Sequence, residues 1–200
     1  MKVRTIYILL IFFIAVGNLT GCASKEDVSL SAQSREAVIQ AEAFLEKSGV
    51  AFNEQNYIVA IDDVEKALNI LRSTQDPEVL RSNTYSLAYK NLIILNNQLG
   101  VSFLKKNIIT DEVANYFQKS LDLILRLDQE APGVKEDINS ALQSAGGLAI
   151  YQSEAYYFLG TIAVEQKDAV KAKEYLAKLR SSGSSQSAAE LEGIIVAAGL

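Results

Sequence analysis

The chain contains no histidine and only one cysteine in 200 residues. Histidine is the commonest general base near neutral pH and the commonest metal ligand, so its absence removes the usual centres of acid–base catalysis and metal binding. A lone cysteine, Cys22, forms no disulfide within the chain. The sequence also lacks a phosphate-cradling glycine loop, a Gly-x-Ser-x-Gly elbow and zinc-ligand spacings. These absences predict a protein that uses no cofactor, binds no metal and is not an enzyme.

Positive charge is scarce as well. The chain has 19 Lys and Arg residues against 24 Asp and Glu residues, a formal net charge of −5. Removal of the first 21 residues, expected for the reasons given next, takes Lys2 and Arg4 away and leaves a net charge of −7. Binding to a nucleic-acid backbone requires a basic patch. We therefore expect no nucleic-acid partner.

The first 22 residues have the layout of an export signal. Lys2 and Arg4 precede an apolar run over residues 6–16, which is too short to span the roughly 30 Å core of a bilayer. The following Leu19-Thr20-Gly21-Cys22 resembles the lipobox of bacterial lipoproteins. The resemblance implies a signal peptide over residues 1–21, lipid such as palmitate on Cys22, and a lipidated tether over residues 22–31. A retained membrane helix is the alternative.

The residue after the cysteine bears on sorting within the envelope. In enterobacterial lipoproteins an aspartate at this place resembles an inner-membrane retention signal, and this chain has Ala23. The localisation implied is the periplasmic face of the outer membrane.

Residues 41–71 are expected to form one helical hairpin. Apolar or small residues recur every three or four positions on both sides of a break at residues 53–56, which is typical of two amphipathic helices. At −4, +12, +16 and +19 from Ser48 lie Phe44, Ala60, Val64 and Ala67. At the same offsets from Gly160 lie Tyr156, Ala172, Leu176 and Leu179. This spacing resembles the tetratricopeptide (TPR) repeat.

A third match lies between these two, with Gly100 as its anchor. The core positions that follow it are each one residue late: Val113, Phe117 and Ser120. This delay predicts a turn lengthened by one residue over residues 107–110. The three anchors are 52 and 60 residues apart, against a family period of about 34, so helical material is inserted between the repeats. The resemblance implies an all-α, TPR-like solenoid over residues 32–200, with about three hairpins, elongated or extra helices and a C-terminal capping helix. An ordinary helical bundle is the alternative.

Periodicity and turn signals predict the individual helices. They are expected over residues 32–53, 57–73, 77–106 and 111–128, then from about residue 134, and finally over residues 186–198. Asp76-Pro77 is interpreted as a helix start, because Asp is a good N-cap and Pro suits the first helical position. Residues 129–133 are expected to form a loop. Gly146-Gly147 is expected to break the helical pattern.

The register also implies a binding face. In TPR domains the first helix of each hairpin lines the ligand groove. The ligand-contacting positions of that helix, counted from the anchors, correspond here to Phe52, Asn53, Asn97, Val101, Lys105, Tyr157 and Thr161. The set is mixed and largely apolar, and it lacks the lysines and asparagines by which chaperone-binding TPRs clamp a terminal carboxylate. We expect an extended or helical protein segment with apolar anchors. The alternative is that the inserted helices fill the groove.

Two functions follow from these observations. The first is a lipid-anchored scaffold or adaptor whose partners are envelope proteins and which supports assembly of an envelope complex. The second is an all-helical envelope enzyme that uses tyrosines or carboxylates such as Asp62-Asp63 and Asp111-Glu112. Adjacent helical positions point about 100° apart, so neither acidic pair forms a converging site by itself. The scaffold is therefore favoured.

Overall fold

The computed structural model describes residues 30–143 and 146–200. In this part of the chain it contains eight α-helices, a 3-10 turn and no strand, which confirms the all-α expectation. The helices are α1 (Ala32–Asn53), α2 (Tyr57–Ser73), α3 (Asn83–Lys105), α4 (Asp111–Glu130), α5 (Pro132–Ala141), α6 (Leu148–Glu165), α7 (Ala169–Ser181) and α8 (Ser185–Ala197). The predicted signal peptide and Cys22 lie outside the described residues.

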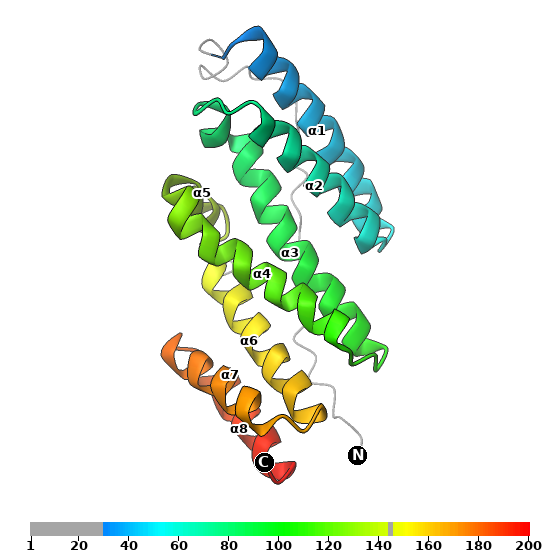
Figure 1. Ribbon diagram of the computed structural model, residues 1–200, viewed down its shortest axis with the longest axis vertical. Coiled ribbons are helices and arrows are strands. Elements are labelled where there is room, and N and C mark those ends of the chain that lie inside the picture. The colour runs from blue at the N-terminus through cyan, green and yellow to red at the C-terminus, as the bar shows by residue number, and fades with distance from the viewer. Residues whose placement is uncertain (1–29, 144–145) are drawn as a thin grey trace.

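Apart from α5 and α6, helices that follow one another in the chain lie side by side (Figure 1). Three helical hairpins are formed by α1 with α2, α3 with α4, and α6 with α7. Contacts of α2 with α3 and of α4 with α6 join the hairpins into an elongated stack. At the end of the stack α8 packs on both α6 and α7. Most of the core therefore lies between helices that are close in sequence.

The three hairpins turn with the same backbone geometry. In each turn the residue seven positions after the anchor has a positive φ: 60° at Gln55, 58° at Asn107 and 59° at Lys167. The next amide then donates to the carbonyl five residues earlier, as Asn56 does to Ala51 at 2.8 Å, Ile108 to Phe103 at 3.0 Å and Asp168 to Ala163 at 2.8 Å. A left-handed residue with this hydrogen bond is the Schellman motif, which ends helices. The three first helices therefore end alike and at one register.

The middle turn, between α3 and α4, is two residues longer than the other two turns. The sequence predicted a lengthening of one residue. Both α2 and α7 begin nine residues after their anchors, whereas α4 begins eleven residues after Gly100. The hydroxyl of Thr110 accepts a hydrogen bond from the Val113 amide at 3.4 Å and so sets the start of α4.

The short helix α5 is the material inserted between the second and third hairpins. It packs on α3 and α4 through Val134 and Ile138, which are buried. The break predicted at the two glycines is confirmed, because Gly146 and Gly147 have φ angles of 93° and 69°. The side-chain oxygen of Asn139 then accepts from the amide of Leu148, the first residue of α6, at 2.9 Å.

The helix predicted over residues 77–106 is divided in two. Val79–Arg81 form a 3-10 turn, and α3 begins only at Asn83, where the Ser82 hydroxyl accepts from the Tyr85 amide at 3.2 Å. The N-cap of α3 is therefore Ser82, whereas the sequence pattern assigned this role to Asp76.

Asp76 instead holds the segment between α2 and α3 in place. One of its carboxylate oxygens accepts from the Glu78 amide at 3.0 Å, and the other accepts from the buried Ser34 hydroxyl at 2.5 Å. The second boundary error is the loop predicted over residues 129–133, since α4 continues to Glu130 and α5 begins at Pro132.

Small residues at the anchors permit close helix packing. A Cβ atom on Gly100 would lie 2.6 Å from a ring carbon of Phe117 on α4, and one on Gly160 would clash with Leu191 on α8. In the first hairpin the buried hydroxyl of Ser48 donates to the Ala60 carbonyl at 2.9 Å. The anchors are thus packing positions.

Candidate protein-binding face

The first helices of the hairpins contact one another across the stack, α1 with α3 and α3 with α6, and α6 also contacts the last helix, α8. On α1 and α3 the contact includes a hydrogen bond of 3.1 Å from the Thr84 hydroxyl to Glu42. Exposed and half-buried residues recur every three or four positions on this side of α3 and α6, and on α1 buried Leu45 interrupts the same spacing. We call these residues the first-helix face: Ile39, Glu42, Gly49 and Asn53 on α1; Ile94, Gln98, Val101 and Lys105 on α3; Glu154, Tyr157, Thr161 and Glu165 on α6.

Two predicted site residues lie at the end of α1. Asn53 is exposed. Phe52 is half-buried and packs edge to face on Tyr57 across the turn, with ring centroids 5.6 Å apart. Phe52 therefore orders the turn as well as contributing apolar surface beside the first-helix face.

Asn97 does not belong to this face, and its prediction as a groove residue is wrong. It is 1% exposed, and its side-chain amide donates to the backbone carbonyl of Tyr151 on α6 at 3.0 Å. A buried amide requires such a partner, so Asn97 connects α3 to α6. The neighbouring Gln98 is half-buried and takes the place that the register assigned to Asn97.

The other predicted residues of α3 and α6 retain accessible surface. Val101 is half-buried, and Lys105 is exposed in the last turn of α3. Tyr157 is half-buried and packs edge to face on Phe158, with centroids 5.3 Å apart. The Thr161 hydroxyl donates to the Tyr157 carbonyl at 2.9 Å and is therefore already bonded within α6.

Carboxylates surround the apolar part of this face. Burial raises the pKa of Glu154, although a hydrogen bond with Asn97 opposes the shift. Burial also raises the pKa of the Tyr157 hydroxyl, as does the negative charge of Glu190 on α8. With Glu165 exposed at the end of α6, the surface suits a segment that carries both apolar and basic side chains.

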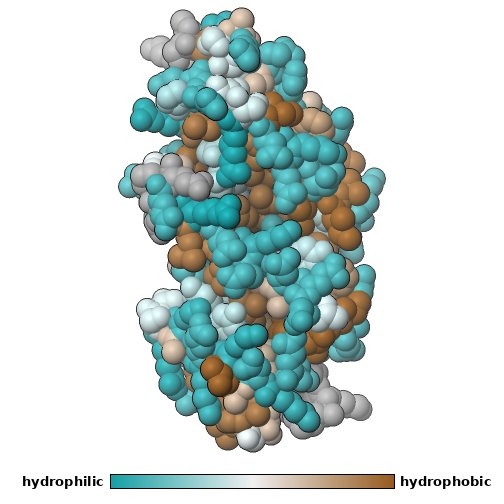
Figure 2. Space-filling view, in the orientation of Figure 1, coloured by the Kyte–Doolittle hydropathy of each residue, from teal (hydrophilic) through white to brown (hydrophobic). Residues whose placement is uncertain are grey.

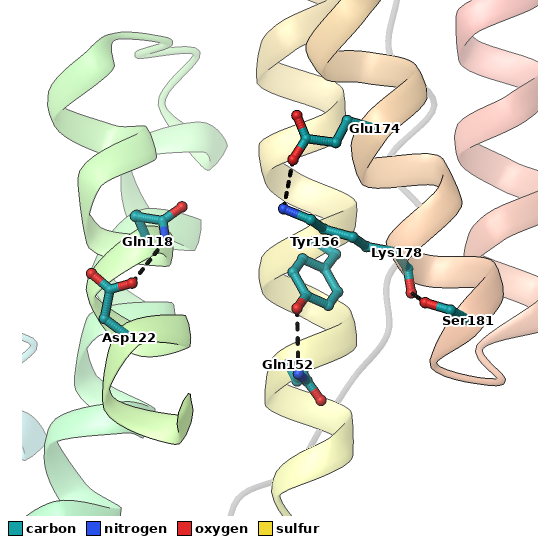
Figure 3. Close-up of polar contacts among 7 residues, drawn as sticks. All are labelled: Gln118, Asp122, Gln152, Tyr156, Glu174, Lys178 and Ser181. Carbon is teal, nitrogen blue, oxygen red and sulfur yellow. Dashed lines mark hydrogen bonds and ion pairs between the residues drawn. The ribbon is translucent and has the colours of Figure 1, made fainter. Parts of the chain in front are cut away.

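Away from this face, the surface of α4, α6 and α7 is of another kind (Figure 3). Hydrogen bonds and ion pairs there join residues four apart on one helix: Gln118 to Asp122 at 2.9 Å, Gln152 to Tyr156 at 3.3 Å and Lys178 to Glu174 at 2.7 Å. None of these three pairs connects α4 to α6 or α7. They are typical of solvated helix surface, where such pairs add little stability.

The acidic pairs named from the sequence are engaged in polar contacts with other side chains. Lys66 lies 2.5 Å from Asp62 and 3.5 Å from Asp63. Asp111 accepts from Gln166, in the turn after α6, at 2.9 Å. Among residues 30–143 and 146–200, no group of three or more His, Cys, Asp or Glu side chains could hold a metal ion.

In comparisons with known proteins, no family model matches the chain, and no curated protein and no solved structure matches it either.

Proposed function

We propose that this chain is a lipid-anchored periplasmic scaffold that holds a segment of an envelope protein on the first-helix face and so supports assembly of a complex. The observation that carries the proposal is the repetition of one Schellman turn, at one distance from Ser48, Gly100 and Gly160. Stacked copies of one helical unit are the architecture of TPR-like solenoids, whose extended faces bind other proteins.

The composition of the first-helix face supports a particular class of segment. Ile94, Val101 and Tyr157 offer apolar surface on two neighbouring helices, and Glu154 and Glu165 lie beside them. An amphipathic helix or an extended strand with basic residues between apolar ones would match both features.

Attachment to the membrane is proposed on the lipobox alone. In the described part of the chain, no helix is long and apolar enough to cross a bilayer. A lipidated Cys22 would hold the domain at the membrane through the tether of residues 22–31, and Ala23 favours the outer membrane.

Site-specific photo-crosslinking in cells tests the binding face. We expect a photoreactive phenylalanine analogue at Gln98 or Tyr157 to form adducts with one protein partner. The same analogue at Lys173, which is exposed on α7, is the control and should form none. Adducts from Lys173 alone would place the partner on the second helices and contradict the proposal.

A further inference from the structure

A cavity of about 360 Å³ opens between α2 and α4, with α3 as its floor. Its apolar residues are Leu68, Leu92 and Leu123, one from each helix. In Figure 1 α4 passes in front of α3 and α6, so this cavity lies on the side facing the viewer. Figure 2 shows hydrophobic surface between hydrophilic side chains on that side. The cavity is separate from the first-helix face.

Arg72 on α2 lines this cavity as a partly buried cation without a counter-ion. Its guanidinium donates to the hydroxyl oxygens of Tyr85 and Tyr89 on α3, the first at 3.3 Å, and lies 5.2 Å from the centre of the Tyr89 ring. No carboxylate of the described residues forms an ion pair with it. Taking a charge out of water is costly unless an opposite charge compensates it, so Arg72 is held ready for an anion.

Two further cations line the cavity from α4. Lys119 and Arg126 are exposed, and within the described residues neither has an ion-pair partner. Glu65 and Asp122 line the same cavity, and Asp122 already accepts from Gln118. The lining thus has three positive and two negative side chains, which suits a singly charged anion better than a dianion.

Amide groups complete the lining. Asn96 is 1% exposed; its nitrogen donates to the Leu92 carbonyl at 2.8 Å, but its oxygen accepts nothing from the described residues. An unsatisfied buried acceptor costs free energy, and a ligand with an N–H donor would relieve that cost. Asn69 on α2 adds a second amide at the rim.

We propose that this cavity binds an acidic segment of another protein, with a side-chain or terminal carboxylate on Arg72 and an apolar neighbour over the three leucines. The planar guanidinium pairs with a carboxylate through two parallel hydrogen bonds. The peptide backbone supplies the N–H donor for Asn96. The site does not depend on the first-helix face, so one protein could hold two different segments on opposite sides of the stack.

Calorimetric titration of the full chain in detergent tests the proposal. The probes are the peptide acetyl-Leu-Leu-Glu-Leu-Leu-amide, its Gln counterpart and inorganic phosphate. We expect the Glu peptide to bind, and both the Gln peptide and the Arg126→Gln variant to weaken binding about tenfold, as the loss of one charge-assisted contact would. Arg35→Gln, an exposed arginine on α1 outside the cavity, should leave the affinity unchanged.

Arg72→Gln is tested beside Arg126→Gln, because Arg72 also packs on Tyr89 and its loss removes a packing contact, whereas Arg126 is exposed. Failure of the Glu peptide to bind overturns the proposal. Equal affinity for the Glu and Gln peptides would contradict recognition of a carboxylate. Displacement of the Glu peptide by phosphate at the same concentration would contradict the assignment of a protein segment as the ligand. An unchanged affinity in Arg126→Gln would place the peptide elsewhere.

Discussion

Gly49 and Gly100 both lie inside helices, but their surroundings differ. A Cβ atom on Gly100 meets the Phe117 ring at 2.6 Å, whereas one on Gly49 meets nothing within 4 Å. Alanine favours a helix over glycine by about 1 kcal/mol. We therefore expect Gly49→Ala to raise the free energy of unfolding by up to about 1 kcal/mol, and Gly100→Ala to lower it by about 1–3 kcal/mol through overpacking. Chemical denaturation measures both, and equal stabilisation by the two substitutions would contradict the packing assigned to Gly100.

Glu154 should make stability depend on pH. Burial raises its folded-state pKa, so the protonated form favours the folded state. This contribution is present in full below the unfolded pKa of about 4.3 and is lost as the pH rises through the folded-state pKa. The stability gained by Glu154→Gln over wild type should therefore grow between pH 4 and pH 7. Denaturant titrations at four pH values measure it, with the exposed Glu165→Gln as control. A pH-independent difference would contradict the burial effect.

Single residues also show where sequence reasoning fails. The TPR-like offset from Gly100 placed Asn97 in a groove, yet a buried asparagine is stable where a backbone carbonyl of another helix accepts a hydrogen bond from its amide. That carbonyl belongs to Tyr151, 54 residues away, and no local pattern reveals it. Arg72 was missed for the same reason, since its tyrosine partners lie on the next helix.

The three turns between hairpin helices give a prediction at the scale of elements. Gln55 and Lys167 occupy a left-handed conformation, where glycine avoids the steric cost of a Cβ atom. Gln55→Gly and Lys167→Gly should each stabilise the chain by up to about 1 kcal/mol, and Lys167→Val should destabilise it by about 1–2 kcal/mol. Thermal melts measure the shifts. Melting-temperature shifts of opposite sign for Gln55→Gly and Lys167→Gly would show that the turns are not equivalent.

Helix boundaries could be predicted where a periodic pattern stops at a local turn. The bounds of α1 and α2 match the predicted spans, and the break at Gly146-Gly147 needs only the preference of glycine for positive φ. The start of α3 could not be predicted in this way. Asp76-Pro77 and Ser82 are both good helix starts, and the choice between them depends on Asp76 bonding to Ser34 on α1, 42 residues away.

For the whole molecule, every proposal about location depends on Cys22. Replacing it as Cys22→Ser should abolish incorporation of labelled palmitate and leave the precursor uncleaved, because the modified sulfur is lost. Metabolic labelling followed by gel separation measures both effects. Wild-type labelling of the variant would contradict lipid attachment, whereas the described helices, the first of which begins at Ala32, should be unaffected.

The order of helices in the stack is also the order in which an exported chain crosses a membrane. When residue 73 has crossed, α1 and α2 can already pair, and α3 then finds a folded surface on α2, where Tyr85 and Tyr89 meet Arg72. Each later helix meets a template completed shortly before it, so closing the next contact requires only a short loop. An emerging chain of this design presents one unfinished helical layer at its leading edge of folding, while the layers that crossed earlier are already closed.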